Sequence, residues 1–452
     1  MSRSVRRMDG LVRAVHVLQQ LLERQHRVES SIATARSGLN RWSGSAVHDT
    51  VAGSLRYIHM YGHMLETSAA SIGGAAWRAF EIPQLRLLMV ASMYQLQQTG
   101  ASRERIHRAI NDSCTALGHD SLKSDVIVAV ERASRSDARR SLSRASAYSL
   151  PSWLYLKLRE SVGSQQLAGF APSLLRRPDR LHLCVTPRLA APDEYAAQLR
   201  FSTKCPATPI HFVPHGVTLL SRPRNITNLP GVKDRLAFVQ DAAQQWCISQ
   251  LSPVQPGQTM LDVCAAPGGK LRAAISRLPI GARIIAVEKS PRKVAALQRE
   301  FSGMAGVEIV CGDASTPSAW WETRWGARHG SIRTIVLDAP CSATGILRTR
   351  PEVKSLQTPE GVAYLCGLQR EMLRALWPKL QVEGELLYIT CSLLHEENEA
   401  IIKSFLCETS DAEVVQMAMP AHGSVAKRSK YGVTFYPCDA HQGAFAAKLR
   451  RR

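Results

Sequence analysis

The first third of the chain repeats its apolar residues at spacings of three and four. Residues 11–22 follow this period, and it returns in four further segments, 51–64, 85–97, 103–117 and 126–133. Such a period is typical of a helix that buries one face. Glycines and serines at 71–74 interrupt the pattern, as a break between helices would. We predict an all-α domain over residues 1–145, and the Ser- and Arg-rich residues 133–149 suit a linker.

Residues 150–228 mix two periodicities. Pro151-Ser152-Trp153 opens a short helical segment, and two runs bounded by prolines, 181–186 and 210–213, are typical of strands. This pattern predicts a small α+β domain, or a connector, between residues 150 and 228.

From residue 229 onward, strands and helices alternate around glycine turns. The predicted strands are 259–263, 282–287, 307–310, 334–337 and 384–389. The predicted helices are 270–277, 291–301 and 362–377. This alternation predicts an α/β domain over residues 229–452. We expect a doubly wound, mostly parallel sheet with its ligand site at the carboxyl ends of the strands.

Charge narrows the class of partner. The chain carries 57 Lys and Arg against 37 Asp and Glu, a net charge of +20. The excess lies within residues 1–350, whereas acids and bases balance over residues 351–452. A broad positive field concentrates polyanions, so charge slightly favours a nucleic-acid partner over a merely solvated surface.

Cysteine usage and hydropathy indicate the compartment. The 11 cysteines form no Cys-x-x-Cys pair, which is typical of a reduced chain without a disulfide frame or a zinc site. Charges break every apolar run short of a membrane span. The basic start, residues 1–10, is followed by no apolar signal segment. We expect a cytoplasmic protein with no metal and no membrane partner.

The first strand of the α/β region ends in a glycine turn. The turn consists of Cys264, Ala265, Ala266, Pro267, Gly268, Gly269 and Lys270. Adjacent glycines let the backbone approach a ligand and expose the first amides of the next helix to it. Glu288 ends the second strand, where a carboxylate can hold both ribose hydroxyls, and Asp313 follows the third, within reach of an adenine amino group. Together these features predict a nucleoside site.

The spacing of this turn discriminates among nucleoside cofactors. It is not Gly-x-Gly-x-x-Gly and lacks the Gly-Lys-Ser/Thr of a P-loop, so a dinucleotide or a triphosphate fits poorly. S-adenosylmethionine fits better, because its carboxylate can meet the helix N-terminus while its ribose meets Glu288. We therefore expect S-adenosylmethionine as the cofactor.

Two cysteines follow the last two predicted strands. Cys341 lies three residues after Asp338, and Cys391 lies in Thr-Cys-Ser. A lone cysteine there is more often a small buried residue, but two at one rim favour chemistry. A thiolate that adds to C6 of cytosine makes C5 nucleophilic towards a methyl donor, and Asp338 could bind ring N3 or the exocyclic amine. The residues alone do not rank the two cysteines.

These segments resemble the RNA cytosine-C5 methyltransferases of the Sun/Fmu or NOL1/NOP2 family. The matching segments are LDVCAAPGGK (261–270), AVEKS (286–290), GDAS (312–315), VLDAPCSATGILRTRP (336–351) and YITCSLLHEENE (388–399). The upstream LPGVKDRLAFVQDAA (229–243) and the tail HQGAFAAKL (441–449) are similar to that family too. The helical leader is similar to the antitermination factor NusB, which indicates the RsmB branch, whose members methylate one cytosine of 16S ribosomal RNA.

The resemblance implies an architecture and a set of roles. The domains would be a NusB-like RNA-binding domain, an RRM-like connector and a Rossmann-like methyltransferase domain that binds S-adenosylmethionine. Cys391 would be the nucleophile and Cys341 would assist product release. The cofactor would contact residues 264–270, Glu288, Asp313 and Asp338.

Several alternatives stay open. Transfer RNA could be the substrate, or the chain could be a non-catalytic RNA-binding assembly factor. DNA cytosine methyltransferases use the Pro-Cys position, here Cys341, as the nucleophile. The basic residues Arg348, Arg350 and Lys354 either hold RNA phosphates or are solvated charge. The acids Glu396, Glu397 and Glu399 either favour a helix N-terminus or take part in catalysis.

Overall fold

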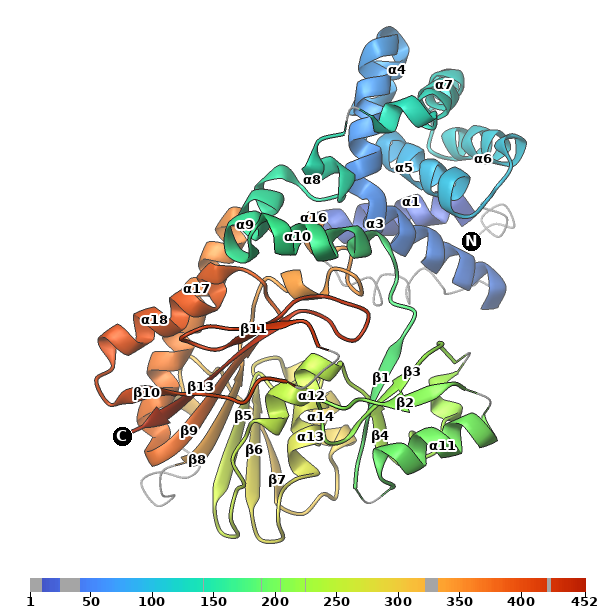
Figure 1. Cartoon of the computed structure of the whole chain (residues 1–452). Coiled ribbons are helices and arrows are strands. Elements are labelled where there is room, and N and C mark those ends of the chain that lie inside the picture. The colour runs from blue at the N-terminus through green and yellow to red at the C-terminus, as the bar shows by residue number, and fades with distance from the viewer. Residues whose placement is uncertain are drawn as a thin grey trace. The chain divides into compact units, whose positions relative to one another are not determined.

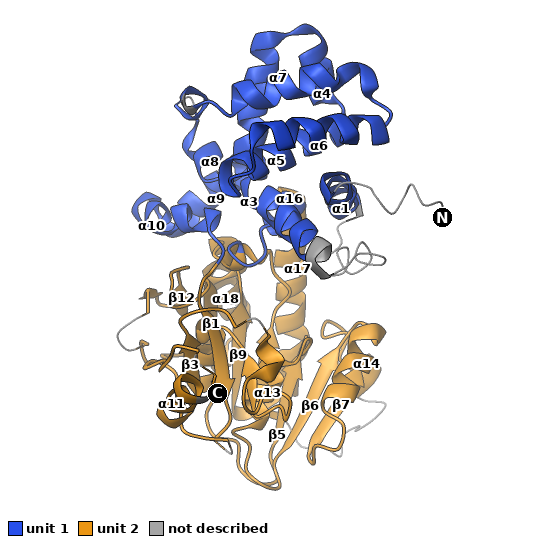
Figure 2. Cartoon of the chain, turned by 90° about the vertical axis from the view of Figure 1, so that its right-hand side faces the viewer, with its two compact units in different colours: residues 1–177, 347–357 blue, residues 178–346, 358–452 orange. Residues whose placement is uncertain are grey.

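The computed structural model describes residues 10–24, 41–140, 142–187, 189–203, 205–223, 225–321, 332–420 and 424–452. The chain forms two compact units. Unit 1 comprises residues 1–177 and 347–357, and unit 2 comprises residues 178–346 and 358–452 (Figure 2). The domain division at 1–145, 150–228 and 229–452 stays a prediction, because packing contacts do not show which segments fold alone. The basic start, residues 1–9, lies outside the described residues.

Unit 1 is helical (Figure 1). Its longer helices are α1 (Gly10–Arg24), α3 (Arg41–Ile72), α4 (Gly74–Glu81), α5 (Pro83–Gln98), α6 (Arg103–Ala116), α7 (Lys123–Ala133) and α9 (Ser152–Val162). Each helical segment predicted within residues 11–133 falls on one of them, whereas α4, with only eight residues, was not predicted. Gly73 and Gly74 break the chain between α3 and α4, with φ of 74° and 53°. The stretch 133–149 holds a 3-10 turn (Ser136–Arg139) and α8 (Arg144–Ala147) instead of an irregular linker.

A segment from the far half of the sequence completes unit 1. Residues 347–357 include the short helix α16 (Val353–Leu356). The Lys354 ammonium donates to the backbone carbonyl of Arg56 at 2.5 Å, and the Arg56 guanidinium donates to the carbonyl of Arg348 at 2.9 Å. Ser355 Oγ lies 3.2 Å from His59 Nε2. This segment is therefore bonded to helix α3.

Unit 2 begins with a small antiparallel sheet in the order β2-β3-β1-β4. Its strands are β1 (Leu181–Val185), β2 (Ala207–Pro209), β3 (Gly216–Leu219) and β4 (Ala237–Val239), and α11 (Pro192–Ser202) packs on them. The strand predicted at 181–186 is confirmed, but the one at 210–213 is wrong. There the chain turns, and the N–H of Val213 donates to the carbonyl of Ile210 at 3.2 Å. Both side chains are buried. The apolar run between prolines therefore packs into the core from a turn and not from a strand.

Among the described residues, unit 2 also contains a nine-stranded sheet in the order β11-β12-β13-β9-β8-β5-β6-β7, with β10 on β13. The bounds are β5 (Thr259–Val263), β6 (Arg283–Glu288), β7 (Val307–Cys311), β8 (Ile332–Asp338), β9 (Leu380–Thr390), β10 (Ala412–Val415), β11 (Ala426–Arg428), β12 (Val433–Phe435) and β13 (Ala444–Arg451). Strands β5 to β9 pair in parallel and are the predicted ones; β10 to β13 pair antiparallel. The sheet is thus mixed rather than mostly parallel.

Helices cover both faces of this sheet. On one face α12 (Ala242–Ser249), α13 (Gly269–Ile275) and α14 (Pro291–Glu300) share a core with Met260, Val336 and Ile389. Side chains alternate along a strand, so Tyr388 points to the other face, where α17 (Pro359–Leu376) and α18 (Glu399–Glu408) pack together. No helix in the described part of the chain is long and apolar enough to cross a membrane.

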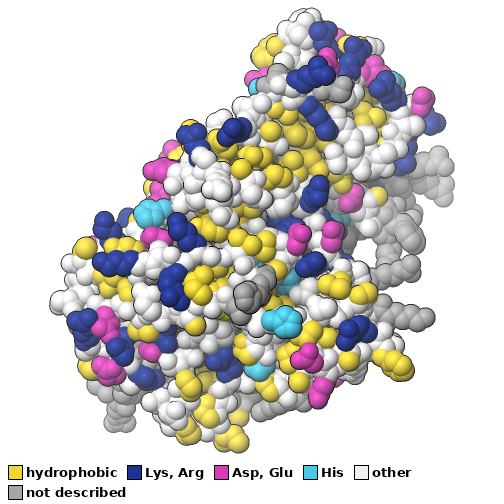
Figure 3. All heavy atoms as spheres, viewed as in Figure 1, with side chains coloured by type: hydrophobic (Ala, Val, Ile, Leu, Met, Phe, Trp, Pro, Cys, Tyr) yellow, Lys and Arg dark blue, Asp and Glu magenta, His cyan; other side chains and the backbone are white. Residues whose placement is uncertain are grey.

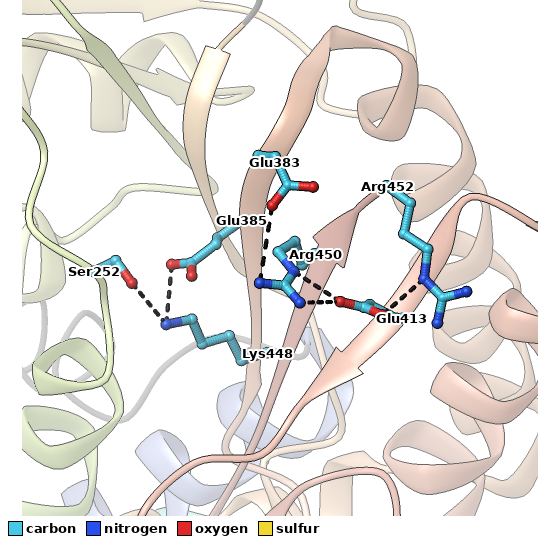
Figure 4. A network of polar contacts seen from close by, with 7 residues as sticks. All are labelled: Ser252, Glu383, Glu385, Glu413, Lys448, Arg450 and Arg452. Atoms are coloured by element: carbon cyan, nitrogen blue, oxygen red, sulfur yellow. Dashed lines mark hydrogen bonds and ion pairs between the residues drawn. The ribbon is translucent and has the colours of Figure 1, made fainter.

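The amino-terminal end of β9 carries a set of ion pairs, called here the strand-edge network (Figure 4). Its members are Ser252, Glu383, Glu385, Glu413, Lys448, Arg450 and Arg452. Lys448 Nζ lies 3.0 Å from both Glu385 and Ser252, and the Nε atoms of Arg450 and Arg452 each lie 2.7 Å from Glu413. The basic tail of the chain is therefore paired with carboxylates.

Candidate active site

The predicted cofactor turn joins β5 to α13. Gly268 caps the helix with φ of 99°, and a Cβ built there would lie 2.8 Å from the Phe301 ring, so both backbone and packing require glycine. The amides of the first helical turn have no acceptor within the helix and could bind an anionic group of a ligand. Burial raises the pKa of the Cys264 thiol, which suits a small packing residue rather than a nucleophile.

Two carboxylates end the neighbouring strands. Glu288 is 6% exposed and accepts from the N–H of Ser290 at 3.0 Å. Asp313 follows β7 and accepts from the N–H and hydroxyl of Ser315 at 2.9 and 2.7 Å. Partial burial raises the pKa of Asp313, but hydrogen bonds from Lys289 and Ser315 outweigh it and hold the pKa below its usual value. Asp313 is therefore favoured as a carboxylate, and both groups offer hydrogen-bond acceptors at one edge of the sheet.

A lysine–aspartate pair lies beside the turn. Lys270 Nζ and Asp338 Oδ2 are 2.7 Å apart. Burial lowers the pKa of Lys270, but the Asp338 carboxylate outweighs it and raises that pKa above its usual value. Lys270 thus points at the end of β8 as a cation. Asp262 is 1% exposed, and within the described residues neither of its oxygens has a hydrogen-bond partner. Burial raises the pKa of Asp262 to about 8, and Asp338 adds to the effect.

The two predicted cysteines meet. Strands β8 and β9 pair in parallel with Asp338 opposite Ile389, so the loops that follow them lie side by side. The sulfurs of Cys341 and Cys391 are 3.4 Å apart, and the N–H of Cys391 donates to the Cys341 sulfur at 3.3 Å. The hydrogen bond to Cys391, burial and the charges of Cys391 and Glu397 raise the pKa of Cys341 well above its usual value. Cys341 therefore keeps its proton when the pair holds one.

Behind the cysteines lies a buried polar group that the sequence analysis did not resolve. Glu397 is 0% exposed and accepts from the N–H of Ser342 at 2.8 Å and from the Ser392 hydroxyl at 2.5 Å. Glu399, in contrast, begins α18, where an acid suits the helix dipole. A serine directly after each cysteine was the signal that could have drawn attention to a shared partner.

Two of the three basic residues predicted as RNA contacts are buried. Arg348 and Lys354 are 4% and 2% exposed and belong to unit 1, and burial lowers the pKa of Lys354 well below its usual value. Arg350 pairs with Glu352 at 2.8 Å. The burial of Arg348 and Lys354 argues against direct phosphate contact, because their polar heads lie inside the protein. Exposed Lys and Arg side chains are scattered over the face shown in Figure 3.

The assembled edge has a definite chemical character. The glycine turn, Glu288, Asp313 and Asp338 end four strands that are consecutive in the sheet, β8-β5-β6-β7. Carboxylates for hydroxyl and amino groups and free amides for a carboxylate fit S-adenosylmethionine. Within the described residues no cluster of His, Cys, Asp and Glu could hold a metal ion.

The chain is similar to known proteins in sequence and in fold. Residues 249–450 match the family described as 16S rRNA methyltransferase RsmB/F. The chain is 29% identical over 418 residues to the ribosomal RNA small subunit methyltransferase B of Vibrio cholerae, covering 90% of this chain and 91% of that protein. It is 30% identical over 374 residues to the protein of the same name from Yersinia enterocolitica, covering 81% and 82%. Its fold is similar to the crystal structure of PH0851, with a TM-score of 0.76, 17% identity and 98% of each chain covered.

Proposed function

The chain belongs to the RsmB/F family of S-adenosylmethionine-dependent ribosomal RNA methyltransferases, and from that premise we propose that it methylates C5 of one cytosine in 16S rRNA. The reaction runs through a covalent bond between Cys391 and C6 of the base. The observation that carries this proposal is that the Cys341 and Cys391 sulfurs lie 3.4 Å apart at the edge where the cofactor residues gather. An rRNA substrate places the reaction in the cytoplasm.

The edge of the sheet supplies the cofactor site of this proposal. The first amides of α13 hold the carboxylate, Glu288 holds the ribose hydroxyls and Asp313 holds the adenine amino group. S-adenosylmethionine, when bound, supplies an electrophilic methyl group. Residues 264–270 and Asp338 complete the contact surface. The ion pair with Lys270 orients Asp338 beside the target base.

The two cysteines divide the work on the base. The Cys391 thiolate adds to C6, and the displaced ring electrons make C5 nucleophilic while Asp338 binds N3 or the exocyclic amine. After addition, Cys391 is a neutral thioether, so its own contribution to the raised pKa of Cys341 is gone, while burial and Glu397 remain. Once C5 carries the methyl group, Cys341 releases its own proton to solvent and its thiolate takes the C5 proton. The C6–S bond breaks, the double bond re-forms and Cys391 leaves as a thiolate.

The test is methyl transfer from labelled S-adenosylmethionine to unmodified 16S rRNA. We expect label at a single cytosine, loss of transfer in Cys391→Ala with cofactor binding intact, and a trapped protein–RNA adduct in Cys341→Ala. Cys407→Ala, which removes an exposed thiol on α18, is the matched control. Activity retained in Cys391→Ala would overturn the nucleophile assignment.

Two outcomes would redirect the proposal. Label on transfer RNA but not on 16S rRNA would make this a tRNA cytosine methyltransferase. Cofactor binding without transfer to any RNA would instead indicate a non-catalytic assembly factor.

A further inference from the structure

The buried group behind the cysteines is referred to here as the cysteine-loop cluster. It consists of Ser342, Thr344, Gln369, Ser392 and Glu397. Ser342 and Thr344 lie on the loop after β8, and Ser392 lies on the loop after β9. Gln369 comes from α17. All five lie within unit 2 and are buried, with Glu397 at their centre.

Glu397 joins the two loops through one carboxyl group. Its Oε1 accepts from the N–H of Ser342 at 2.8 Å and from the Gln369 amide at 3.2 Å. Its Oε2 accepts from the hydroxyls of Ser342 and Ser392. Because each serine directly follows a cysteine, the carboxylate holds the backbone next to Cys341 and the backbone next to Cys391 at the same point.

Further bonds tie the loops together around this centre. Thr344 Oγ1 lies 3.1 Å from Ser392 Oγ and accepts from the N–H of Leu393 at 2.9 Å. The N–H of Gly345 donates to the carbonyl of Cys391 at 2.8 Å. The Gln369 amide also donates to the carbonyl of Pro340 at 2.8 Å. Both loops are therefore held on both sides of their cysteines.

Glu397 is itself fixed in place. The Tyr388 hydroxyl donates to the carbonyl of Glu397 at 2.7 Å. The side chain of the next residue, Asn398, accepts from the Thr390 hydroxyl at 2.6 Å and donates to the carbonyl of Ser392 at 2.9 Å. The turn that carries Glu397 is thus bonded back to the end of β9, so the carboxylate has little freedom to move.

We propose that Glu397 is a positioning residue that acts through Ser342 and Ser392 to hold the Cys341 and Cys391 sulfurs in contact. The inference builds on the proposed function, since it assigns a role in the same site. Its negative charge also faces Cys341 and contributes to the raised pKa of that thiol. Glu397 touches neither the base nor the cofactor in this role, and its effect is on geometry.

The test compares Glu397→Gln with Glu399→Gln in the full chain. Both changes remove one carboxylate from the same segment, but only the first removes it from the cysteine-loop cluster. The first readout is the rate at which diamide joins Cys341 to Cys391 as a disulfide, followed by peptide mass spectrometry. We expect this rate to fall several-fold in Glu397→Gln and to be unchanged in Glu399→Gln.

The second readout is single-turnover methyl transfer. Misplacement of reacting groups by about 1 Å costs on the order of 100-fold in rate, so we expect kcat to fall about 10- to 100-fold in Glu397→Gln. The KM for RNA and the Kd for S-adenosylmethionine should stay within about twofold, because uniform binding is untouched. The double variant Ser342→Ala/Ser392→Ala should reproduce the loss without changing the charge.

The two readouts separate the proposals. Unchanged cross-linking in a folded Glu397→Gln protein would overturn the positioning role. If no RNA accepts a methyl group from the native protein, the proposed function fails, yet the cross-linking rate still decides the role of Glu397. If Glu397→Gln does not fold, the double serine variant decides it, and cross-linking at the native rate would again overturn the role.

Discussion

The two ends of strand β9 carry polar networks of opposite kinds. At its amino-terminal end, the strand-edge network pairs arginines and a lysine with three carboxylates, and Arg450 and Arg452 are 43% and 64% exposed (Figure 4). At its carboxyl end, the cysteine-loop cluster gathers neutral donors around one carboxylate, Glu397, which is 0% exposed. The same strand thus carries the exposed arginine pairs of Glu413, beside the buried Lys448–Glu385 pair, at one end and a buried hydrogen-bonded centre at the other.

The two networks differ in how strongly their charges constrain the structure of unit 2. Exposed ion pairs are screened by water and salt and cost side-chain entropy, so they contribute little. A buried carboxylate loses its hydration, and burial raises the pKa of Glu397 against the hydrogen bonds from Ser342 and Ser392 that lower it. Buried polar groups that lose their partners are costly. The buried cluster therefore constrains the loops, whereas the exposed arginine pairs of the strand-edge network constrain little.

The largest expected effect is that of Glu397→Ala. It leaves the N–H of Ser342 and the hydroxyls of Ser342 and Ser392 without their acceptor in a buried site. We expect the free energy of unfolding to fall by about 3 kcal/mol. Each buried group left without a partner costs about 1–3 kcal/mol, and relaxation of the site recovers part of the sum. Urea denaturation measures it, with Glu399→Ala as the control. If Glu397→Ala lowered the free energy of unfolding no more than Glu399→Ala, the proposed difference between the two ends of β9 would be contradicted.

The buried carboxyl of Asp262, which has no hydrogen-bond partner among the described residues, gives a second test of how burial affects a charge. Burial raises the pKa of Asp262 to about 8, whereas the unfolded chain ionises this group near pH ~4. Between these values the folded state holds a proton that the unfolded state has released. This group therefore weakens folding by about 1.4 kcal/mol for each pH unit of increase, or about 3 kcal/mol from pH 5 to 7.

Asp262→Asn should remove that dependence. The free energy of unfolding of the variant, measured in urea at pH 5, 6 and 7, should fall less steeply with pH than that of the native chain. The stability gained by the substitution should shrink as the pH falls through about 4, below which the native carboxyl is protonated in both folded and unfolded states. Parallel pH curves for the two proteins would show that Asp262 is already ionised in the fold.

The smallest expected effect is at the strand-edge network. Glu413 receives bonds from both Arg450 and Arg452, yet these partners are exposed. Glu413→Gln should change Tm by no more than about 2 °C, and the difference should vanish in high salt. Calorimetry at low and high salt checks this. A larger, salt-independent loss of Tm would mean that the two ends of β9 do not differ in the way described.

Much of the fold was predictable because its signals are local. Strand β5 falls on the predicted residues, and Glu288, Asp313 and the two cysteines come to one edge because parallel strands carry their following residues there. The antiparallel strands β10 to β12 are only three or four residues long and show no period of their own. They form by pairing with one another and with β13, which is a tertiary effect.

What stayed unpredictable depended on contacts across long stretches of sequence. Arg348 looks like a solvated charge in the sequence, but its carbonyl meets Arg56, which is 292 residues away. Glu397 looks like one of three acids before a helix, and only the turn fixed by Tyr388 and Asn398 directs it inward. The spacing of apolar and polar residues along the sequence does not indicate in which direction such a side chain points.

Residues 347–357 belong to unit 1 although they are distant from the rest of it in sequence, and this limits how the protein can be truncated or combined with a relative. A fragment that ends at Arg177 would lack α16, and a fragment that begins at Pro178 would carry Lys354 without its hydrogen-bond acceptor on helix α3. The unit is discontinuous in sequence, so one crossover in the gene cannot exchange it whole. Chimeras between relatives should retain function only when the leader and this segment come from the same parent.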